Sequence, residues 1–471
     1  MELAGKKVLV VGLARSGVAA AKFALSRGAT VVANDVRGEP ALRKESAEIR
    51  ELGAGCILGS HPEAEFVASD LIILSPGVPS NLGPLEAARK AGIPVLAEAE
   101  FAYRFLKGRM IGITGSNGKT TTTKLIGHLM EGTGARVQVG GNVGMPLTSL
   151  IESSRPDGWT VAELSSFQLE NIYRLRPHVS VVTNITPDHL DRYPSYEDYV
   201  RAKENIFRSQ KASDFAVLNG DSPEVLRMAA EAKDRAETAS EFPQPIYFSS
   251  SGRPASGTAS IWLKDGRVVT TLVSEGESEL VPASEIPLVG IHNVENVMAA
   301  AAAVICALRA AAVDLPVLKD AIRGFPGVEH RIEFVAEIGG IKFYNDSKAT
   351  NVDSTIKALE SFRGNVVLIL GGRDKGSDYT TLASLIEQKV KSIVVIGEAS
   401  DKIESQLSGI RPITRAGSMA EAMSSATAEA GPGDTVLLAP ACSSFDMFEN
   451  YEHRGKVFKE EVRQLAARSR G

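Results

Sequence analysis

The sequence predicts an α/β protein of three domains, each built on a mostly parallel sheet. Three segments run from an apolar, β-branched strand into a glycine-rich turn: KKVLVVGLARSG from Lys6, RMIGITGSNGKT from Arg109 and NVVLILGGRDKG from Asn365. A strand followed by such a turn is typical of the opening unit of a parallel α/β domain. A chain of 471 residues also exceeds what one core of ordinary size holds, so several domains are expected.

The domain boundaries are expected at two glycine-containing joints. One lies near Leu106 to Arg109, and the other is GFPGVEHR, around Phe325 to Arg331. We therefore expect domains over residues 1–107, 108–327 and 328–471. Within the middle one, SIWLKDGRVVTTLV predicts a β-hairpin added antiparallel to the sheet.

Composition limits the classes of function. Hydrophobic residues make up 44% and charged residues 23%, and the formal net charge is −5, so bulk attraction to nucleic acid or anionic lipid is not expected. The first residues enter a strand pattern without the charged, apolar and small-residue regions of a leader peptide, so none is expected. We also expect no membrane span, because no apolar run approaches the required length. The three widely separated cysteines predict neither a disulfide framework nor a zinc site. We expect a cytoplasmic protein that binds neither nucleic acid nor membrane.

The first domain nearly has the dinucleotide fingerprint. Gly12, Ala14 and Gly17 take the three glycine positions, and Asp35 follows about twenty residues later, after a second strand. Ala14 places a methyl group where a glycine would let the backbone approach a pyrophosphate, so a tight strand-to-helix turn without a ligand is the alternative. The turn Ser75–Gly77 follows another strand and is expected at the same edge of the sheet, which favours a ligand there.

The middle domain contains GITGSNGKTTTT, which is typical of a phosphate-binding loop. Backbone N–H groups around Gly115 to Lys119 can surround an anion at a helix N-terminus, with Lys119 reaching the outer phosphates and Thr120 binding magnesium. The first glycine of the usual spacing would fall at Ile113, so only a shorter G-x-x-G-K-T form is present. A purely structural turn is the alternative.

Three ionisable residues follow this loop at the ends of predicted elements. Glu163 ends a buried strand, His189 follows another, and Lys203 lies on the next helix. Taken singly they indicate an ion-pair partner, a turn residue and a solvated lysine. Together they indicate a metal site, although the lysine carries the wrong charge for one.

Nine motifs in order over nearly the whole chain resemble the Mur ligase family of peptidoglycan synthesis. They are TGSNGKTTTT, GGNVG, ELSSFQLE, NITPDHLDRY, GIHNVENVMAA, HRIE, NDSKATN, LGGRDKG and APACSSFDMFENYEHRG. The resemblance implies a Rossmann-like N-terminal domain for UDP, a central P-loop ATPase domain and a Rossmann-like C-terminal domain for the incoming amino acid. NDSKATN and the ACSSFD block are most similar to the member that adds D-glutamate to UDP-N-acetylmuramoyl-L-alanine.

The resemblance also implies the chemistry. ATP phosphorylates the L-alanyl carboxylate, and the amine of D-glutamate attacks the resulting acyl phosphate. Two magnesium ions are expected, and in the family the lysine at Lys203 is carbamylated, which would make it an anion able to face magnesium. A monomer is expected.

The resemblance assigns roles residue by residue. Residues implied to bind ATP are Gly115, Ser116, Asn117, Gly118, Lys119, Thr120, Thr121, Asn293, Asn296, Arg331 and Asp346. Those implied to bind the uridine substrate are Arg15, Ser16, Asp35, Ser75, Gly77, Asn142, Ser165 and Gln168. Those implied to bind D-glutamate are Thr350, Lys375, Ser444, Phe445 and Tyr451. The implied metal ligands are Thr120, Glu163, His189 and carbamylated Lys203, and the implied catalytic residues are Lys119, Glu163, His189, Lys203 and Lys348.

Simpler interpretations exist for several of these residues. Asn293 and Asn296 could be helix caps, Arg331 a surface arginine and Lys375 a solvated turn residue. LGGRDKG has no Ser or Thr directly after its lysine, so it does not predict a second ATP site.

Three classes of function compete. A nicotinamide dehydrogenase leaves TGSNGKT unexplained, and a P-loop switch leaves NDSKATN and ACSSFD unexplained, whereas an ATP-dependent amide ligase uses all three. Within that class, a sister Mur ligase or a folyl-polyglutamate-type enzyme is the alternative.

Overall fold

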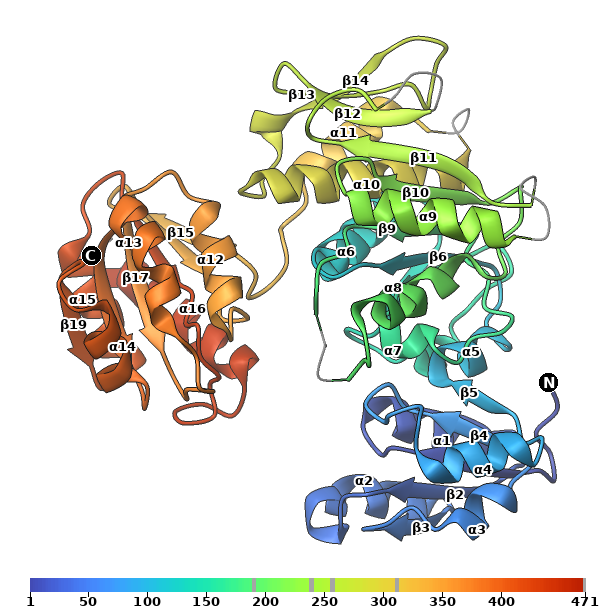
Figure 1. The fold of residues 1–471 in the computed structure, drawn as a ribbon. Helices are drawn as coiled ribbons and strands as arrows, with labels where there is room; N and C mark the ends of the chain where they lie inside the picture. The colour runs from blue at the N-terminus through green and yellow to red at the C-terminus, as the bar shows by residue number, and fades with distance from the viewer. Residues whose placement is uncertain (189–191, 237–240, 255–258, 310–312, 469–471) are drawn as a thin grey trace. The chain divides into compact units, whose positions relative to one another are not determined.

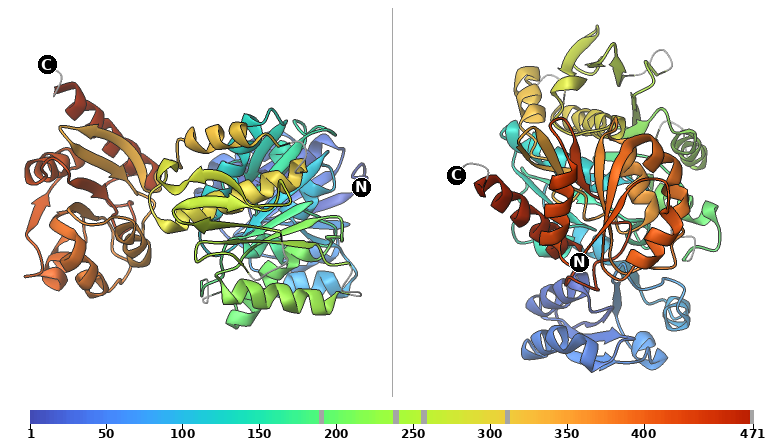
Figure 2. Two further views of the ribbon diagram at one scale, coloured as in Figure 1. Left: turned by 90° about the horizontal axis from the view of Figure 1, so that it is seen from above. Right: turned by 90° about the vertical axis from the view of Figure 1, so that its left-hand side faces the viewer.

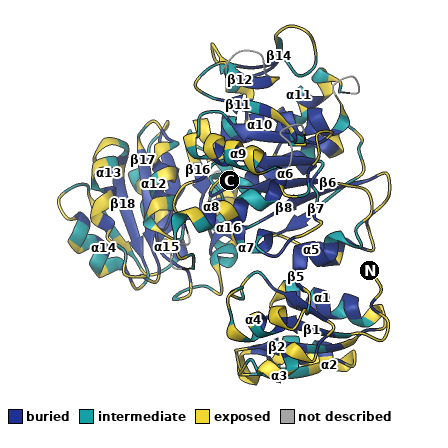
Figure 3. Ribbon diagram, turned by 45° about the vertical axis from the view of Figure 1, so that its right-hand side comes forward, coloured by how far each residue is buried: buried dark blue, intermediate teal, exposed yellow. Residues whose placement is uncertain are grey.

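The computed structural model describes residues 1–188, 192–236, 241–254, 259–309 and 313–468. Its strands form three sheets, each flanked by helices (Figure 1), and Figure 2 shows the same ribbon from two further directions. In each sheet the strands are more deeply buried than the helices beside them (Figure 3). The predicted three-domain α/β fold with mostly parallel sheets is confirmed.

The first sheet has five parallel strands in the order β3-β2-β1-β4-β5. Along β1, Val8 and Val10 face one apolar cluster while Leu9 and Val11 face another, so both sides of the sheet are covered. Its strands are β1 Lys7–Val11, β2 Thr30–Asp35, β3 Gly55–Leu58, β4 Leu71–Leu74 and β5 Val95–Ala97. The helices of this part are α1 Arg15–Ser26, α2 Glu39–Glu51, α3 Glu63–Val67, α4 Gly83–Lys90 and α5 Glu98–Tyr103.

The second sheet has nine strands in the order β14-β13-β12-β11-β10-β9-β6-β8-β7. Only β12, β13 and β14 pair antiparallel to one another, and the turn Asp265–Gly266 joins β12 to β13, so the predicted hairpin is confirmed. The strands are β6 Arg109–Thr114, β7 Val137–Gly141, β8 Trp159–Glu163, β9 Val179–Val182, β10 Phe215–Asn219, β11 Gln244–Ser249, β12 Ser260–Lys264, β13 Arg267–Thr270 and β14 Ser278–Pro282. The helices are α6 Lys119–Gly132, η1 Leu147–Leu150, α7 Ser166–Leu169, α8 Tyr196–Glu204, η2 Asn205–Phe207, α9 Pro223–Arg235, η3 Ala283–Glu285, α10 Ile291–Leu308 and α11 Leu315–Arg323.

The third sheet has six strands in the order β15-β16-β20-β17-β18-β19, and only the pair β15/β16 is antiparallel. Leu368 and Leu370 of β17 face one cluster and Val367 and Ile369 the opposite one, as in a sheet covered on both sides. The strands are β15 Glu333–Ile338, β16 Ile341–Asn345, β17 Val366–Gly371, β18 Val390–Ile396, β19 Ile413–Ala416 and β20 Thr435–Leu438. The helices are α12 Val352–Glu360, η5 Tyr379–Leu382, α13 Ala383–Lys389, α14 Ser400–Leu407, α15 Met419–Glu429 and α16 Tyr451–Arg468.

Strand order decides where ligands can bind. β1 lies between β2 and β4, β6 between β8 and β9, and β17 between β18 and β20. At each of these positions the order of the strands reverses direction. The loops after the neighbouring strands then diverge and leave a crevice at the carboxyl ends of the strands. Each of the three strand-to-glycine turns read from the sequence follows the strand at a reversal.

The chain divides into two compact units. Unit 1 contains Met1–Ile286 and Val294–Phe325, and unit 2 contains Pro287–Asn293 and Pro326–Gly471. The first two sheets belong to unit 1 and the third to unit 2.

Helix α10 corrects one expectation. It has 18 residues with a mean hydropathy of 1.5, enough by length and composition to cross a membrane, whereas the sequence was expected to contain no such run. Of this stretch, 78% is buried inside the protein, including every residue from Val297 to Ala307. The apolar run therefore belongs to a core helix, whose alanines allow close packing.

Candidate active site

The phosphate loop connects β6 to α6 in unit 1. Gly118 precedes α6 in the left-handed conformation and, as a glycine, has no side chain that could cap the first turn. First-turn N–H groups have no partner within a helix, and this is the arrangement in which helix N-termini bind anions. The Nζ atom of Lys119 donates to the carbonyls of Gly115 and Ser116, both at 2.8 Å.

Both glycines of the loop are required by close contacts. A Cβ on Gly115 would lie 2.0 Å from Thr183 Oγ1, and one on Gly118 would lie 2.4 Å from Asn296 Oδ1. Their φ angles of 142° and 81° are also ones that side-chain-bearing residues rarely adopt. The short motif therefore keeps the glycines that its geometry needs.

Lys203 reaches the same loop from helix α8. Its side chain is buried, and its Nζ donates to the carbonyl of Gly115 at 2.8 Å, the oxygen that Lys119 also contacts. The Nζ also lies 4.6 Å from the centre of the Tyr199 ring. Burial, and then the charge of Lys119, hold the pKa of Lys203 well below its usual range, while Asp188 and Glu163 act in the opposite sense. The solvated-lysine interpretation is therefore wrong for this residue.

The loops after β7 and β8 converge on Glu163. Asn142 Nδ2 donates to Glu163 Oε1 at 3.2 Å, while Glu163 Oε2 is buried and has no hydrogen-bond partner among the described residues. Ser165 and Gln168 form a reciprocal capping box on α7 that uses Gln168 Oε1. Gln168 Nε2 is likewise buried without a partner in the described part of the chain. A buried acceptor and a buried donor thus remain for a ligand.

The donor set fits a magnesium site completed by other groups. No three His, Cys, Asp or Glu side chains gather as a metal site anywhere in the described ranges. Glu163 supplies one unpartnered carboxylate oxygen, and Thr120 lies in the first turn of α6. Magnesium usually takes one or two protein carboxylates plus phosphates and water, so this set suits it. His189 lies outside the described residues.

The first-domain residues form a braced turn. Ser75 Oγ donates to the carbonyl of Gly12 at 2.7 Å, which ties the two glycine turns together. Asp35 accepts from Leu13 N at 2.8 Å and from the guanidinium of Arg37 at 2.7 and 3.0 Å. Burial opposes ionisation of Asp35, but the bonds from Arg37 and Leu13 outweigh it and lower its pKa.

The remaining first-domain predictions lie beside this turn. Arg15 and Ser16 are the first two residues of α1, and Arg15 is exposed. A Cβ on Gly77 would meet nothing within 4 Å, so close packing does not require a glycine there.

A hollow of about 400 Å³ lies within unit 1, between the first and second sheets. Its walls combine residues 79–81, which follow β4, with Glu170 and residues 192–205 of the middle part. Arg192 lies on one wall, where its guanidinium stacks 3.7 Å from the Phe167 ring and donates to the Val78 carbonyl at 2.8 Å.

In unit 2, Arg331 and Asp346 interact near the start of the third sheet. Asp346 accepts from Ile332 N at 3.3 Å. Burial raises the pKa of Asp346 to about 7, against the opposing charge of Arg331. Asp346 can therefore exchange a proton near neutral pH.

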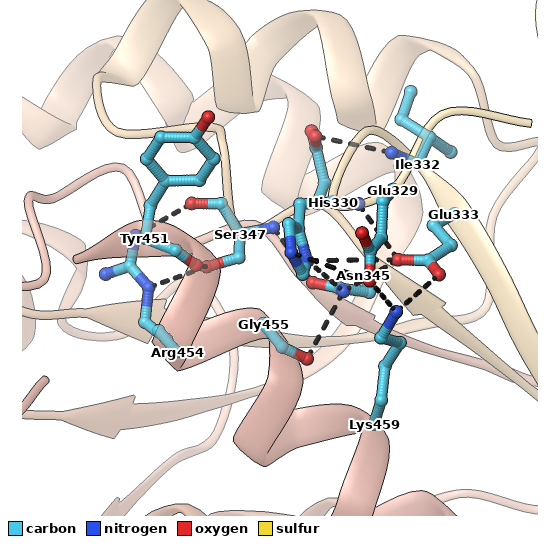
Figure 4. Close-up of polar contacts among 11 residues, drawn as sticks. Glu329, His330, Ile332, Glu333, Asn345, Ser347, Tyr451, Arg454, Gly455 and Lys459 are labelled. Atoms are coloured by element: carbon cyan, nitrogen blue, oxygen red, sulfur yellow. Dashed lines mark hydrogen bonds and ion pairs between the residues drawn. The ribbon is translucent and has the colours of Figure 1, made fainter. Parts of the chain in front are cut away.

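A polar cluster holds this segment against α16 (Figure 4). Asn345 Nδ2 lies 2.9 Å from His330 Nδ1 and 3.0 Å from Glu333 Oε2, and Lys459 bridges Glu329 and Glu333. A Cβ on Gly455 would lie 2.2 Å from the His330 ring, so the imidazole packs directly on the α16 backbone. The chain entering unit 2 is therefore fixed to its last helix.

Arg454 links three loops of unit 2. It is completely buried and donates to Ser347 Oγ at 3.0 Å and to the Ser347 carbonyl at 2.8 Å (Figure 4). It also donates to the Cys442 carbonyl at 3.1 Å. A longer bond reaches the carbonyl of Gly371. Burial lowers its pKa to about 10. The loops after β16, β17 and β20 therefore meet around one guanidinium.

These three loops carry the residues predicted for amino-acid binding. Lys348 Nζ lies 5.4 Å from the centre of the Tyr451 ring, and Thr350 N donates to the Lys348 carbonyl. Ser444 is buried, whereas Lys375 and Phe445 are exposed. A hollow of about 600 Å³ in this unit lies instead beyond β18 and β19 and contains none of the predicted residues.

The two asparagines of α10 differ. Asn296 accepts from Thr122 Oγ1 at 3.2 Å and faces the first turn of α6. Asn293 Nδ2 donates to the Val289 carbonyl at 2.7 Å, a contact with the residues just before the helix. The Asn293 contact is not a helix cap, because its side-chain nitrogen donates to a carbonyl instead of its oxygen accepting from a helix N–H. Asn296 faces the helix of the phosphate loop.

Sequence reasoning missed Arg37, Tyr199 and Arg454. Tyr199 Oη lies 2.7 Å from Ser116 Oγ, which joins Lys203's helix to the phosphate loop. Tyr199 is four positions before Lys203 on α8, so helical spacing could have indicated it. Arg37 lies in the turn after β2, where no such spacing applies. No local signal marks Arg454 as buried.

Comparisons with known proteins agree over the whole chain. The Mur ligase MurD-like N-terminal domain matches residues 6–97, the Mur ligase middle domain 113–304, and the Mur ligase glutamate ligase domain 330–442. UDP-N-acetylmuramoylalanine--D-glutamate ligase of Acidobacterium capsulatum is 50% identical over 98% of this chain and 97% of its own. The protein of that name from Koribacter versatilis is 45% identical over 99% of both chains.

Solved structures share the fold. UDP-N-acetylmuramate-alanine ligase from Thermotoga maritima aligns with a TM-score of 0.56 and 19% identity, covering 98% of this chain and all of its own. A pseudomurein peptide ligase type C from Methanothermus fervidus gives a TM-score of 0.56 at 18% identity, with 98% and 100% coverage. At these identities the likeness concerns the fold alone.

Proposed function

Since the chain belongs to the Mur ligase family, we propose that it ligates D-glutamate to UDP-N-acetylmuramoyl-L-alanine, consuming ATP, in the synthesis of peptidoglycan precursors. The names of relatives at 42–50% identity over nearly the full chain support this choice within the family. The observation that carries it is the convergence of Lys119, Lys203 and the unpartnered Glu163 oxygen on one phosphate loop.

Phosphoryl transfer is assigned to the loop residues 115–121. The loop N–H groups and Lys119 would hold the ATP phosphates and offset the charge that develops on the transferring phosphoryl group. The L-alanyl carboxylate attacks the γ-phosphorus, the bond to the β-phosphate oxygen breaks, and ADP leaves. Asn296 is proposed to approach the nucleotide from α10, and Asn293, Arg331 and Asp346 are assigned to ATP as well.

Magnesium is assigned to Thr120, Glu163, His189 and Lys203. When bound, the metal would neutralise phosphate and carboxylate charge and bring the two together. We propose that Lys203 is carbamylated: its uncharged amine attacks carbon dioxide, an N–C bond forms and one proton is released. Burial of Lys203 supports this modification, because desolvation favours the neutral amine. Two ions are proposed.

Amide formation is assigned to unit 2. The D-glutamate amine attacks the acyl phosphate and phosphate leaves, while Lys348 and Lys375 would hold carboxylate charge on the amino acid. Thr350, Ser444, Phe445 and Tyr451 complete this proposed pocket. Support comes from Arg454, which gathers the three loops that carry these residues.

The uridine substrate is assigned to the carboxyl edge of the first sheet and to the loops after β7 and β8. The proposed residues are Arg15, Ser16, Asp35, Ser75, Gly77, Asn142, Ser165 and Gln168. The proposed domains remain 1–107, 108–327 and 328–471, and the enzyme is proposed to be a cytoplasmic monomer.

Phosphate release tests the proposal. ATP and UDP-N-acetylmuramoyl-L-alanine are supplied with D-glutamate, L-glutamate, meso-diaminopimelate or L-lysine in turn. Release with D-glutamate alone, with a product heavier by one glutamyl residue, is expected. Release with another amino acid would move the enzyme to a sister ligase step, and release without either small substrate would indicate a P-loop switch.

A further inference from the structure

Two glutamates of α5 are fully buried where the first and second sheets of unit 1 adjoin. Glu98 and Glu100 both have no exposed surface. Burying a carboxylate is costly unless hydrogen-bond donors compensate it, so each of these residues requires partners within the protein. Neither belongs to any motif assigned above.

Both carboxylate oxygens of Glu100 accept hydrogen bonds, most of them from a short segment of the middle domain. It accepts from the backbone N–H groups of Tyr173, Arg174 and Leu175 at 2.8–3.2 Å, and from Arg104 Nε at 2.9 Å. Three consecutive N–H groups around one carboxylate form an anion nest. A carboxylate offers only acceptors, which matches this set of donors.

Glu98 binds a second loop more weakly. Its Oε1 accepts from Thr148 N at 2.7 Å and from Thr148 Oγ1 at 2.6 Å, while Oε2 has no partner within the described part of the chain. Burial raises its pKa despite these bonds. The neutral, protonated form of Glu98 is therefore favoured by its surroundings.

Aromatic residues in α5 and just after it pack against the first domain. Phe101 and Phe105 pack edge-on against Phe23 of α1, with ring centroids 5.8 and 4.9 Å away. Helix α5 thus connects α1 through its rings to the middle sheet through its carboxylates. It is a strut between the two sheets of unit 1.

The loops held by this strut lead to the proposed reaction centre. The Glu100 nest begins four residues after α7, whose capping box contains Ser165 and Gln168. Thr148, which Glu98 binds, likewise comes shortly after Asn142, the residue that donates to Glu163. Resting on the proposed function, the substrate must reach from the uridine end at the first sheet to the phosphate loop of the second, so the spacing of the two ends must match it.

We propose that Glu100 is a positioning residue that fixes the spacing between the uridine-binding edge and the reaction centre. It acts through the 173–175 nest and touches no substrate. Loss of the nest would leave each end of the substrate with its own site but would misalign the two. The defect would therefore appear only with a ligand that spans both.

The test compares Glu100→Gln with Glu98→Gln, two residues earlier on the same helix. For Glu100→Gln we expect kcat/KM for UDP-N-acetylmuramoyl-L-alanine to fall about tenfold or more. The neutral amide oxygen would hold the three N–H groups that bond Oε2 more weakly than the carboxylate does, and the amide nitrogen, in place of Oε1, would face Arg104 Nε as donor against donor. Inhibition by UDP alone, and the KM values for ATP and D-glutamate, should change less than about twofold. Glu98→Gln should leave all four quantities unchanged, since one amide oxygen can keep both Thr148 bonds.

Several outcomes would overturn the proposal. Unchanged kcat/KM in Glu100→Gln would do so, and so would a parallel loss of UDP, ATP and D-glutamate binding, which would indicate general disruption. If that variant fails to fold, Arg104→Gln, which removes one of the four donors, should show a smaller loss confined to the spanning substrate. Wild-type enzyme that does not ligate D-glutamate would reject the proposed function and not the strut. Binding of UDP-N-acetylmuramoyl-L-alanine by Glu100→Gln, compared with binding of UDP alone, would still test the strut.

Discussion

The phosphate loop of unit 1 and the LGGRDKG loop of unit 2 share a pattern and differ in what fills the turn. Both follow a buried parallel strand, and both contain glycines and a lysine. In the first, the residue before the helix is Gly118, which has no side chain that could cap it. In the second, Asp374 occupies the turn and accepts from Lys402 Nζ, Tyr379 Oη and Ser377 N at 2.8–3.1 Å.

The difference teaches that a strand, glycines and a lysine do not by themselves specify a phosphate site. An internal carboxylate can satisfy the donors that would otherwise bind an external anion. The second loop is then rigid before any ligand arrives, and its exposed Lys375 can serve a ligand beside the turn. Four substitutions test this contrast.

Lys119→Ala should have the largest effect. Removing the cation over the phosphate loop should lower the rate of phosphoryl transfer about 10³-fold, because its charge would act mainly on the transition state. Lys124→Ala, an exposed lysine on the same helix, is the matched control. Phosphate release by Lys119→Ala at the control's rate would remove the phosphate role from this loop.

Lys203→Ala should lower turnover about 10²-fold or more, because the proposed carbamate would be lost. Added formate, acetate or propionate should restore part of the rate by supplying a carboxylate in its place. Lys211→Ala, an exposed lysine beyond the same helix, should neither lose activity nor respond to the acids. A defect that no acid relieves would argue that Lys203 acts as an ammonium.

Lys375→Ala should raise the KM for D-glutamate about tenfold, the effect of losing a bond to a charged group. The KM for ATP should stay constant, because the turn is proposed to hold no phosphate. Arg373→Ala, which removes an exposed ion pair with Glu398 on the same loop, is the control. A change in the KM for ATP instead would indicate that the LGGRDKG loop also contacts phosphate, as the loop of unit 1 is proposed to do.

Asp374→Asn should have the smallest effect and depends on pH. The bonds from Lys402, Tyr379 and Ser377 outweigh burial and lower the pKa of Asp374 to about 2 from its ordinary 3.8. The carboxylate therefore stabilises the fold above about pH 4, and this contribution is lost as pH falls through about 2. Because the side chain is about a quarter exposed, we expect a destabilisation of about 1 kcal/mol at pH 7.

Thermal unfolding of wild type and Asp374→Asn across this range measures the effect. A gap of about 3 °C at pH 7 should close toward pH 2. A gap that is the same at every pH would show that the carboxylate charge does not brace the turn.

Local pattern was sufficient for much of the fold and the phosphate loop. The strand-to-glycine turns, the hairpin at Asp265–Gly266 and the glycines at Gly115 and Gly118 all depend on residues close in sequence. The apolar run of α10 was overlooked, although the mean hydropathy of Ile291–Leu308 is a property of the sequence. Hydropathy along the chain does not reveal that this run is buried inside the protein, which only the structure shows.

The sequence by itself determined the α/β class, the three strand-to-glycine turns and, through ordered motifs, the family. Periodicity and turn chemistry are local, and motif order requires no coordinates. Only the tertiary structure decided that Lys203 and Lys119 share the Gly115 carbonyl, that Arg454 gathers three loops, and that Glu100 receives the nest at 173–175. These contacts join residues up to about a hundred positions apart, and their strength depends on burial, which packing alone creates.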